Sequence, residues 1–232
     1  MIRRLVLFDI DGTLLTSAHA GRRALRSAFA AEYQDLAFFD AVRFDGKTDP
    51  QILVELHHAA GAPDRATHTA ITATLDRYVI HLEREVAERA NLVQPCPGIP
   101  ELLDALEARD DVMIGLLTGN IVPGAKLKLG AAGIDFDRFV VGAFGSDSAH
   151  RPDLPAIAAE RARSQFGHIP NGEEVVIVGD TPADVTCGLG IGARSVAVAT
   201  GSYSVEELRT AGATAAFATL ADTAAVVASI IA

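Results

Sequence analysis

The 232-residue chain has few cysteines, no dense basic stretch and no long apolar run. Its two cysteines, Cys96 and Cys187, belong to neither a C-x-x-C pair nor a His-rich segment, which argues against a zinc site. A single disulfide between them stays open at this point. Nothing in the sequence indicates export, however, so we expect a cytoplasmic protein in a reducing environment.

The charge balance is acidic, with 30 Asp and Glu against 20 Lys and Arg and a formal net charge of -10. Because no basic stretch is dense enough to follow a phosphate backbone, we expect neither nucleic acid nor an anionic membrane as a partner. The apolar runs at 5–10 and 224–232 are both too short to cross a bilayer. We interpret the first as a buried strand rather than a signal peptide, and the last as a helix on the core.

Hydrophobic residues make up 49% of the chain, which is enough for a substantial core. Short apolar runs rich in β-branched residues predict strands that are buried on both faces. These runs are 5–10, 112–117, 139–141, 175–178 and 195–198. Predicted helices lie between them, at 99–108, 123–132, 154–166, 184–190 and 205–211. This alternation predicts an α/β fold with a Rossmann-like parallel sheet.

A long segment near the N-terminus interrupts the alternation of strands and helices. No buried-strand run occurs between Thr16 and Gln94, and amphipathic patterns predict helices there instead. These helices are expected at 22–32, 50–60 and 64–90. The punctuated segment 94–98, Gln-Pro-Cys-Pro-Gly, marks the return to the sheet. The expected domains are an α/β core of residues 1–15 and 97–232 and an inserted all-helical cap of residues 16–96.

The first predicted strand ends in Asp9-Ile10-Asp11-Gly12-Thr13, which places two carboxylates at the carboxyl edge of the sheet. Ligands bind at this edge in parallel α/β sheets. A single aspartate at a strand end is often only a turn or cap residue. The full pentapeptide directly after a buried strand favours a functional site.

Two further strand ends carry polar residues. Thr118-Gly119 offers a hydroxyl and close backbone approach to a phosphoryl group, although such a pair is also common in turns. Asp180 and Asp184 follow the fourth strand, where Asp184 alone could serve only the helix dipole. Carboxylates this close cannot all stay ionised without a cation, and oxygen ligands suit Mg²⁺ better than zinc. We therefore expect Mg²⁺ and phosphate to be bound together.

A positive group is expected beside the phosphate, and the candidates are Lys126, Lys128 and Arg151. Lys126 is typical of a solvated surface, and Lys128 is expected to face solvent or a neighbouring acid. We favour Arg151, which follows the third strand and precedes Pro152 and a new helix that should fix its backbone. We interpret His150 as a plain loop residue. No Ser-His-Asp or Cys-His arrangement competes with these groups.

The D-x-D-G-T, Thr-Gly and G-D-x-x-x-D motifs, in this order, resemble those of the haloacid dehalogenase-like hydrolase superfamily over nearly the whole chain. The helical insertion resembles the cap of members of the phosphoglycolate phosphatase type. The resemblance implies that Asp9 is the nucleophile, forming an aspartyl-phosphate, and that Asp11 protonates the leaving oxygen and then activates water. It also implies a Mg²⁺ site formed by Asp9, the Asp11 carbonyl and Asp180, with Asp184 orienting a metal-bound water.

The same resemblance implies that Thr118 and Gly119 bind phosphoryl oxygens, and we place the neighbouring Asn120 among the substrate-binding residues. The family usually presents Lys-Pro where this chain has Arg151-Pro152. Arginine binds phosphate well, so the function is retained with this change. The alternative is that Lys128 supplies the charge.

The cap is expected to close over the site, exclude water and select the substrate. Its loop 45–49, with Lys47 and Thr48, is a candidate for contact with the leaving group. Arg22 and Arg23 are further candidates, for which a solvated surface is at least as good an interpretation.

We expect a Mg²⁺-dependent phosphatase that acts on small phosphorylated metabolites. The nearest alternative is a phosphomutase of the hexose-phosphate type, in which the aspartyl-phosphate passes to another hydroxyl. A dehalogenase fits less well, because that branch lacks the second acid, here Asp11. A catalytically silent phosphate-binding protein is the last alternative, and the retention of Asp9, Asp11, Thr118 and Asp180 argues against it.

Overall fold

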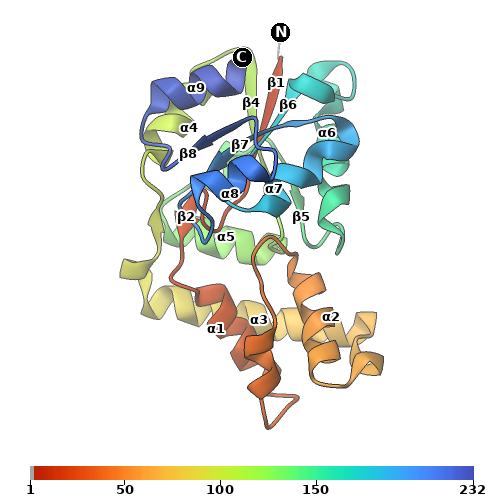
Figure 1. Cartoon of the computed structure of the whole chain (residues 1–232). Helices are drawn as coiled ribbons and strands as arrows, with labels where there is room; N and C mark the ends of the chain where they lie inside the picture. Colours follow the sequence, from red (N-terminus) through yellow and green to blue (C-terminus); the bar gives the residue numbers. More distant parts are fainter. Residues whose placement is uncertain (1–2) are drawn as a thin grey trace.

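The computed structural model describes residues 3–232 of the chain, and a parallel sheet of six strands lies at its centre (Figure 1). The strands are β1 (Arg4–Phe8), β4 (Val112–Thr118), β5 (Val141–Phe144), β6 (Val175–Gly179), β7 (Arg194–Val198) and β8 (Ala215–Phe217). Their order in the sheet is β5-β4-β1-β6-β7-β8. β1 therefore lies inside the sheet, between β4 and β6. The predicted α/β fold with a Rossmann-like parallel sheet is confirmed.

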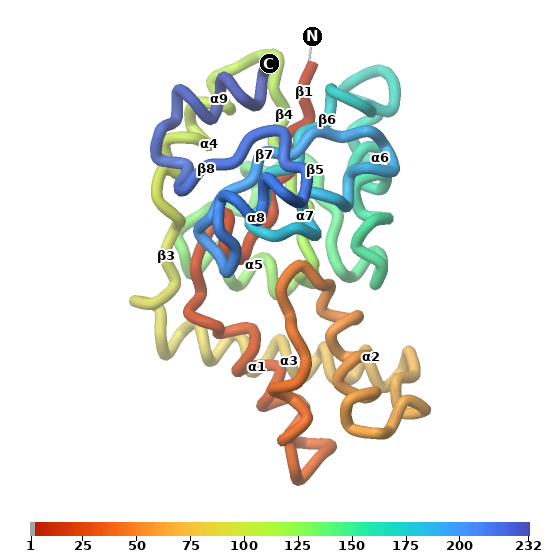
Figure 2. Tube along the Cα trace, in the orientation of Figure 1, coloured from red at the N-terminus to blue at the C-terminus, as the bar shows by residue number. Residues whose placement is uncertain are grey.

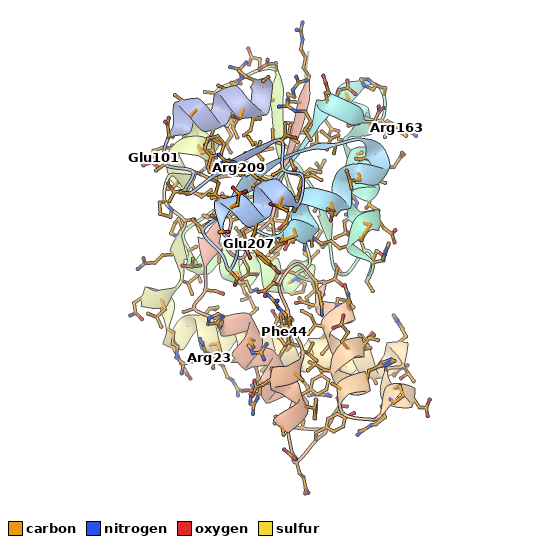
Figure 3. The ribbon with its side chains drawn as sticks, viewed as in Figure 1. Arg23, Phe44, Glu101, Arg163, Glu207 and Arg209 are labelled. Atoms are coloured by element: carbon orange, nitrogen blue, oxygen red, sulfur yellow. The ribbon has the colours of Figure 1, made fainter. Side chains whose placement is uncertain are left out.

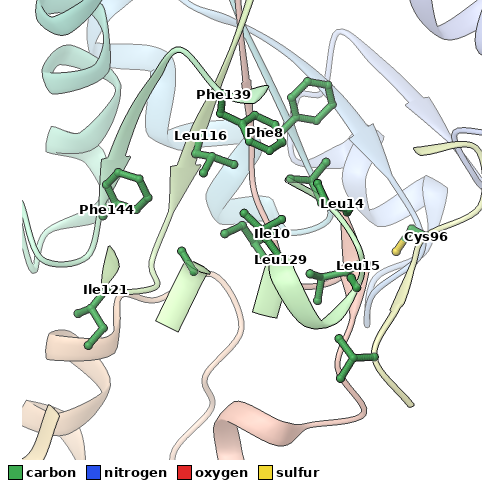
Figure 4. Close-up of a cluster of buried hydrophobic side chains, with 14 of the residues drawn as sticks. Phe8, Ile10, Leu14, Leu15, Cys96, Leu116, Ile121, Leu129, Phe139 and Phe144 are labelled. Atoms are coloured by element: carbon green, nitrogen blue, oxygen red, sulfur yellow. The ribbon is translucent and has the colours of Figure 1, made fainter. Parts of the chain in front are cut away.

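Helices cover both faces of the sheet, because successive side chains of a strand point to opposite sides. Val6 and Phe8 of β1 pack in one apolar cluster, and Leu5 and Leu7 pack in another on the opposite face. The first face is covered by α4 (Ile99–Glu107), α5 (Val122–Ala131) and α9 (Thr223–Ile231). The opposite face is covered by α6 (Leu154–Phe166), α7 (Pro182–Cys187) and α8 (Val205–Thr210). Figure 4 shows the first cluster, with Phe8 and Leu116 beside Phe139.

The predicted helices at 22–32, 50–60 and 64–90 correspond to α1 (Ala20–Phe29), α2 (Asp49–Ala59) and α3 (His68–Glu88). We call residues 17–93 the helical insertion. It leaves and rejoins the sheet through β2 (Leu15–Thr16) and β3 (Gln94–Pro95), which pair antiparallel. The insertion lies beyond the carboxyl edge of the sheet, and the C-terminal helix α9 lies at the opposite end (Figure 2). The division of the chain into a core and a cap domain stays a prediction.

The position predicted for the third strand, 139–141, is wrong. The strand β5 begins at Val141 and pairs with the end of β4, up to Thr118↔Phe144. Before it, the N–H of Phe139 donates to the carbonyl of Phe136 in a 3₁₀ turn (3.2 Å). Val140 is 58% exposed, although its N–H donates to the Ile114 carbonyl of β4 (3.1 Å). The observed strand contains Gly142 and Ala143, whose low β propensity hid it from the sequence pattern.

Cys96 and Cys187 are both buried free thiols, so the disulfide that the sequence left open does not form. Within residues 3–232, no helix has the length and apolar character that crossing a membrane requires.

Candidate active site

Three aspartates from two strand ends meet at the carboxyl edge of the sheet. Asp9 follows β1, and its N–H donates to the carbonyl of Val178 in β6 (2.9 Å). Asp180 follows β6, and Asp184 lies in the first turn of α7. One carboxylate oxygen of each lies within 4.8 Å of those of the other two, and all three side chains are buried. The sequence thus predicted the position of all three groups.

The charges of this carboxylate cluster are poorly compensated by the protein. Burial raises the pKa of Asp9 to about 7, with Arg151 opposing the shift and the charges of Asp184 and Asp11 adding to it. Burial and the charges of Asp184, Asp9 and Asp11 raise the pKa of Asp180 to about 9. Carboxyl groups with such pKa values need a further cation to be ionised together at neutral pH. A hard divalent ion with oxygen ligands fits this set of donors.

Arg151 is the cation nearest to this cluster. It starts the 3₁₀ turn before α6 and is only 5% exposed. Its Nη2 lies 3.3 Å from Asp9 Oδ1 and also pairs with Asp184 Oδ1. The other oxygen of Asp184 accepts from the N–H and the hydroxyl of Thr181 (3.0 and 2.7 Å), at the start of α7. The sequence argument thus placed Arg151 at the correct edge of the sheet.

Gly12 and Thr13 complete the first motif around Asp180. Gly12 has a φ of +79°, and a Cβ on it would lie 2.3 Å from Asp180 Oδ2. Only glycine satisfies both the left-handed backbone and this close approach. The hydroxyl of Thr13 donates to Asp180 Oδ1 (3.3 Å). The pentapeptide therefore supplies both Asp9 and the backbone against which Asp180 packs.

Asp11 lies in a different environment from the three clustered aspartates. Its Oδ2 accepts from Asn120 Nδ2 (2.9 Å) and from Lys128 Nζ (2.5 Å). Its Oδ1 accepts from the hydroxyl of Ser17 (3.1 Å). Burial raises the pKa of Asp11, but Lys128, Asn120 and Ser17 together lower it below its ordinary value. Two aspartates only two residues apart therefore have pKa values shifted in opposite directions.

Lys128 does not face solvent, which was one of the two environments expected for it. It is 4% exposed, and its Nζ also donates to Asn120 Oδ1 (2.6 Å). The alternative expectation, a neighbouring acid, is correct, and that acid is Asp11. Lys126 lies with its Nζ 4.9 Å from the ring centroid of Phe136. Sequence reasoning missed the contact between Lys128 and Asp11, since no local pattern links residues so far apart.

Thr118 and Asn120 form one polar unit at the end of β4. The Thr118 hydroxyl oxygen accepts from the side chain and the backbone N–H of Asn120 (2.8 and 3.3 Å). Thr118 is fully buried, and its side chain lies at the sheet edge that carries the aspartates. Because both bonds use oxygen lone pairs, the hydroxyl proton stays available to an acceptor such as a phosphoryl oxygen.

Residues 45–49 of the helical insertion, here called the docking loop, contact the core at the same sheet edge. The N–H of Asp49 donates to the carbonyl of Gly119 (2.7 Å), and Asp49 Oδ2 accepts from the N–H of Ile121 (2.9 Å). The hydroxyl of Thr48 donates to the carbonyl of Ala149 (2.8 Å). The Lys47 carbonyl lies over Gly119, but its ammonium pairs with Glu55.

Sequence reasoning named the whole loop 45–49 and selected Lys47 and Thr48 as binding residues, but it did not predict that Asp49 contacts the core. Burial raises the pKa of Asp49 to about 6, with Lys128 and the Ile121 N–H opposing the shift. A Thr-Asp-Pro sequence is a common helix start, which concealed the second role of Asp49 as a contact with the core.

The side chains of Arg22 and Arg23 make contacts with other residues of the helical insertion. Arg22 donates to the carbonyls of Val42 and Phe39, and its guanidinium lies 4.5 Å from the ring centroid of Phe44. Arg23 pairs with Glu85 (2.7 Å). Figure 3 shows Arg23 on α1 and Phe44 near the docking loop.

His150 is mostly exposed and contacts Asp153 (3.0 Å), as expected for a loop residue.

Comparisons with known proteins show the family and the fold that this chain shares. A model of the haloacid dehalogenase-like hydrolase family matches residues 3–192. A search of curated proteins gives no match. A solved hydrolase from Pseudomonas syringae is 23% identical over 97% of both chains, with a TM-score of 0.73. CbbY from Rhodobacter sphaeroides, solved in complex with phosphate, is 22% identical over 96% of both chains, with a TM-score of 0.72.

A beta-phosphoglucomutase from Clostridium difficile is also similar, with 18% identity and a TM-score of 0.73. The match covers 100% of this chain and 98% of that protein. At such identities the solved structures show a shared fold. The family model covers most of the chain, motifs included, so the protein belongs to the haloacid dehalogenase-like hydrolases.

Proposed function

We propose that this hydrolase is a Mg²⁺-dependent phosphatase of small phosphorylated metabolites, with Asp9 as its covalent nucleophile. The observation that carries the proposal is the separation of Asp9 and Asp11 into two environments at one sheet edge. Asp9 belongs to a buried carboxylate cluster beside Arg151, whereas Asp11 is held by Lys128, Asn120 and Ser17. The two surroundings give the carboxyl groups different pKa values, and a bound cation would be needed to keep the nucleophile Asp9 ionised.

The cluster would hold Mg²⁺ through the carboxylates of Asp9 and Asp180 and the carbonyl of Asp11, with Asp184 behind them. The ion, when bound, would neutralise part of the phosphate charge and favour the ionised form of Asp9 at neutral pH. Arg151 and Thr181 hold the Asp184 carboxylate in place. This support is what a residue that orients a ligand from behind requires.

Phosphoryl binding falls to three groups around Asp9. Arg151 has a buried Nε with no partner among residues 3–232, so this N–H is free to donate to a phosphoryl oxygen. Thr118 has its hydroxyl proton available at the neighbouring strand end. The backbone of Gly119 lies beside it. Donors preorganised in this way stabilise the charge of a transferring phosphoryl group.

The reaction then has two steps with Asp9 and Asp11 in separate roles. The first step starts with Asp9 ionised and Asp11 protonated: Asp9 attacks phosphorus, the bond from phosphorus to the leaving oxygen breaks, and that oxygen takes the proton of Asp11. Because Lys128, Asn120 and Ser17 lower the pKa of Asp11, only a fraction of the protein carries this proton at neutral pH. In the second step water attacks the aspartyl-phosphate and gives a proton to Asp11. Phosphate leaves, and both carboxyl groups return to their starting forms.

The helical insertion acts as the cap in this proposal. The docking loop brings Thr48 and Asp49 into buried positions against the core strand ends. Closure of this kind excludes water during transfer and lets insertion residues select the leaving group. The proposed division is the one expected from the sequence, with residues 16–96 as the cap.

The test is phosphate release from aryl phosphate and a panel of phosphorylated metabolites, in Mg²⁺ and in EDTA, with Asp9→Asn as control. We expect release only with Mg²⁺ and wild-type Asp9, and beryllofluoride, an aspartyl-phosphate mimic, bound at Asp9. Full activity in chelator would refute the metal, and an active Asp9→Asn would refute the nucleophile. Conversion of a hexose phosphate to its isomer without phosphate release would show the phosphomutase instead.

A further inference from the structure

Lys128 is a buried cation at the boundary between the core and the helical insertion. It projects from α5, is 4% exposed, and bonds Asp11 Oδ2 and Asn120 Oδ1. Burying an ammonium group costs free energy unless it is paired, and here the partners are both site residues. An ion pair that only stabilised the fold could use any acidic side chain, whereas this one uses Asp11, from the motif that contains the proposed nucleophile Asp9.

Through Asn120, the same ammonium orients a second site residue. Lys128 donates to the amide oxygen of Asn120, which directs the amide NH₂ toward Asp11 and Thr118. With the amide reversed, two groups of donor hydrogens would face each other, so Lys128 permits one orientation. These hydrogen bonds therefore connect Lys128 to the Asp11 carboxylate and, through Asn120, to the Thr118 hydroxyl.

Burial of Lys128 depends on the helical insertion. A Cβ on Gly21 of α1 would lie 3.2 Å from Lys128 Nζ and 3.5 Å from the hydroxyl of Tyr78 in α3. Tyr78 and Leu82 of α3 also lie over Gly124, one turn before Lys128 in α5. Helices α1 and α3 thus form the cover that keeps water from the ammonium group. The side chain of Lys128 is 5% exposed and that of Asp11 40%, so the contact is shielded from water on the lysine side, which strengthens it.

We infer that Lys128 is a positioning residue, through which closure of the helical insertion over the core sets the geometry of Asp11 and Thr118. The inference rests on the proposed phosphatase function, in which Asp11 transfers the proton. Closure of α1 and α3 shields the contacts of Lys128, and these contacts hold Asp11 and Asn120 in their working orientations. In this inference Lys128 acts through Asp11 and Asn120 and not on the substrate itself.

The test compares Lys128→Met with Lys126→Met, a matched change on the same helix at a residue whose Nζ lies 4.9 Å from the ring centroid of Phe136. The measurement is kcat/KM for p-nitrophenyl phosphate and for an alkyl phosphate, because only the alkyl leaving group needs a well-placed proton donor. Because Lys128 also lowers the pKa of Asp11, kcat/KM is measured over a pH range and compared at the acidic limit, where Asp11 is protonated in both proteins. There we expect Lys128→Met to lose up to about 10²-fold on the alkyl ester and far less on the aryl ester. Lys126→Met should change neither.

A second variant perturbs Lys128 from the insertion side. Gly21→Ala adds a methyl group 3.2 Å from Nζ and should give a several-fold loss on the alkyl ester, while α1 gains helix propensity. Gly124→Ala meets its neighbours at 3.6 Å, an ordinary contact, and serves as its control. Equal losses on both esters, or a Lys128→Met enzyme that matches Lys126→Met, would overturn the inference.

A crystal structure of Lys128→Met provides a readout that does not depend on activity. We expect the Asn120 amide and the Asp11 carboxylate to turn from their wild-type positions. Unchanged positions of both groups would refute the positioning role even if the protein proved not to be a phosphatase. An inactive wild-type protein would instead refute the proposed function alone.

Discussion

Gly119→Ala tests whether the docking loop must contact the core for catalysis. A Cβ at this position would lie 2.0 Å from the carbonyl oxygen of Lys47 and 2.9 Å from the Cα of Thr48. Both obstacles are backbone atoms, so no side-chain rotation relieves the overlap. The loop must retreat by about 1.4 Å to bring this carbonyl oxygen to an ordinary contact distance. The substitution keeps the backbone N–H of residue 119.

The expected loss of activity is worked out from the hydrogen bonds that this movement of the loop breaks. They are the hydrogen bond from the Asp49 N–H to the Gly119 carbonyl, that from the Ile121 N–H to the Asp49 carboxylate, and that from the Thr48 hydroxyl to the Ala149 carbonyl. At about 1 kcal/mol each, their loss destabilises the docked loop by about 3 kcal/mol. That free energy corresponds to a loss of roughly 10²-fold in the closed population and in kcat/KM.

The assay is kcat/KM for a phosphate ester together with thermal unfolding of the same variant. The control is Gly130→Ala in α5, where an added Cβ meets nothing within 4 Å. We expect the control to keep wild-type activity, and Gly119→Ala to lose activity with little change in the unfolding temperature. If Gly119→Ala keeps kcat/KM within a few-fold of wild type, docking of this loop is not required and the reasoning is wrong.

Three further predictions address the aspartates and Arg151. Arg151→Ala should lose about 10²-fold to 10³-fold in kcat/KM, and Arg151→Lys should recover much of it. Lys126→Ala should keep wild-type activity. An Arg151→Ala enzyme with wild-type activity would show that another residue binds the phosphoryl group. Asp11→Asn should slow esters with poor leaving groups most, and equal slowing of activated and unactivated esters would contradict its role as the acid. Because the pKa values of Asp9 and Asp180 rise to about 7 and about 9, the folded protein binds more protons than the unfolded chain above the ordinary value of 3.8. The free energy of unfolding of the metal-free protein should therefore fall as pH rises from 3.8 to about 9. Thermal unfolding in EDTA at several pH values measures this fall, and Asp180→Asn should make it smaller. A stability that rises over the same window would contradict these shifts.

Most strands of the sheet, and the polar residues at its carboxyl edge, could be predicted from the amino-acid sequence. Continuous apolar runs marked β1, β4, β6 and β7, because strands buried on both faces need no polar residues. Their carboxyl ends meet in any parallel sheet, so Asp9, Thr118 and Asp180 were predictable as neighbours without knowing their distances. The prediction failed for β5, whose Gly142 and Ala143 carry no strand signal of their own.

Tertiary structure alone decided the environment of Lys128 and the second role of Asp49. Helix α5 has no apolar stripe that reveals which of its faces is buried, and Lys128 shares its buried face with Gly124 and Ala125. That face is buried because α1 and α3, more than thirty residues away in the chain, close over it. Local patterns record which residues can form a helix or a strand, whereas the partner of a buried charge is set by contacts between distant segments. For this reason Asp11 was predictable from its motif, but the cation beside it was not.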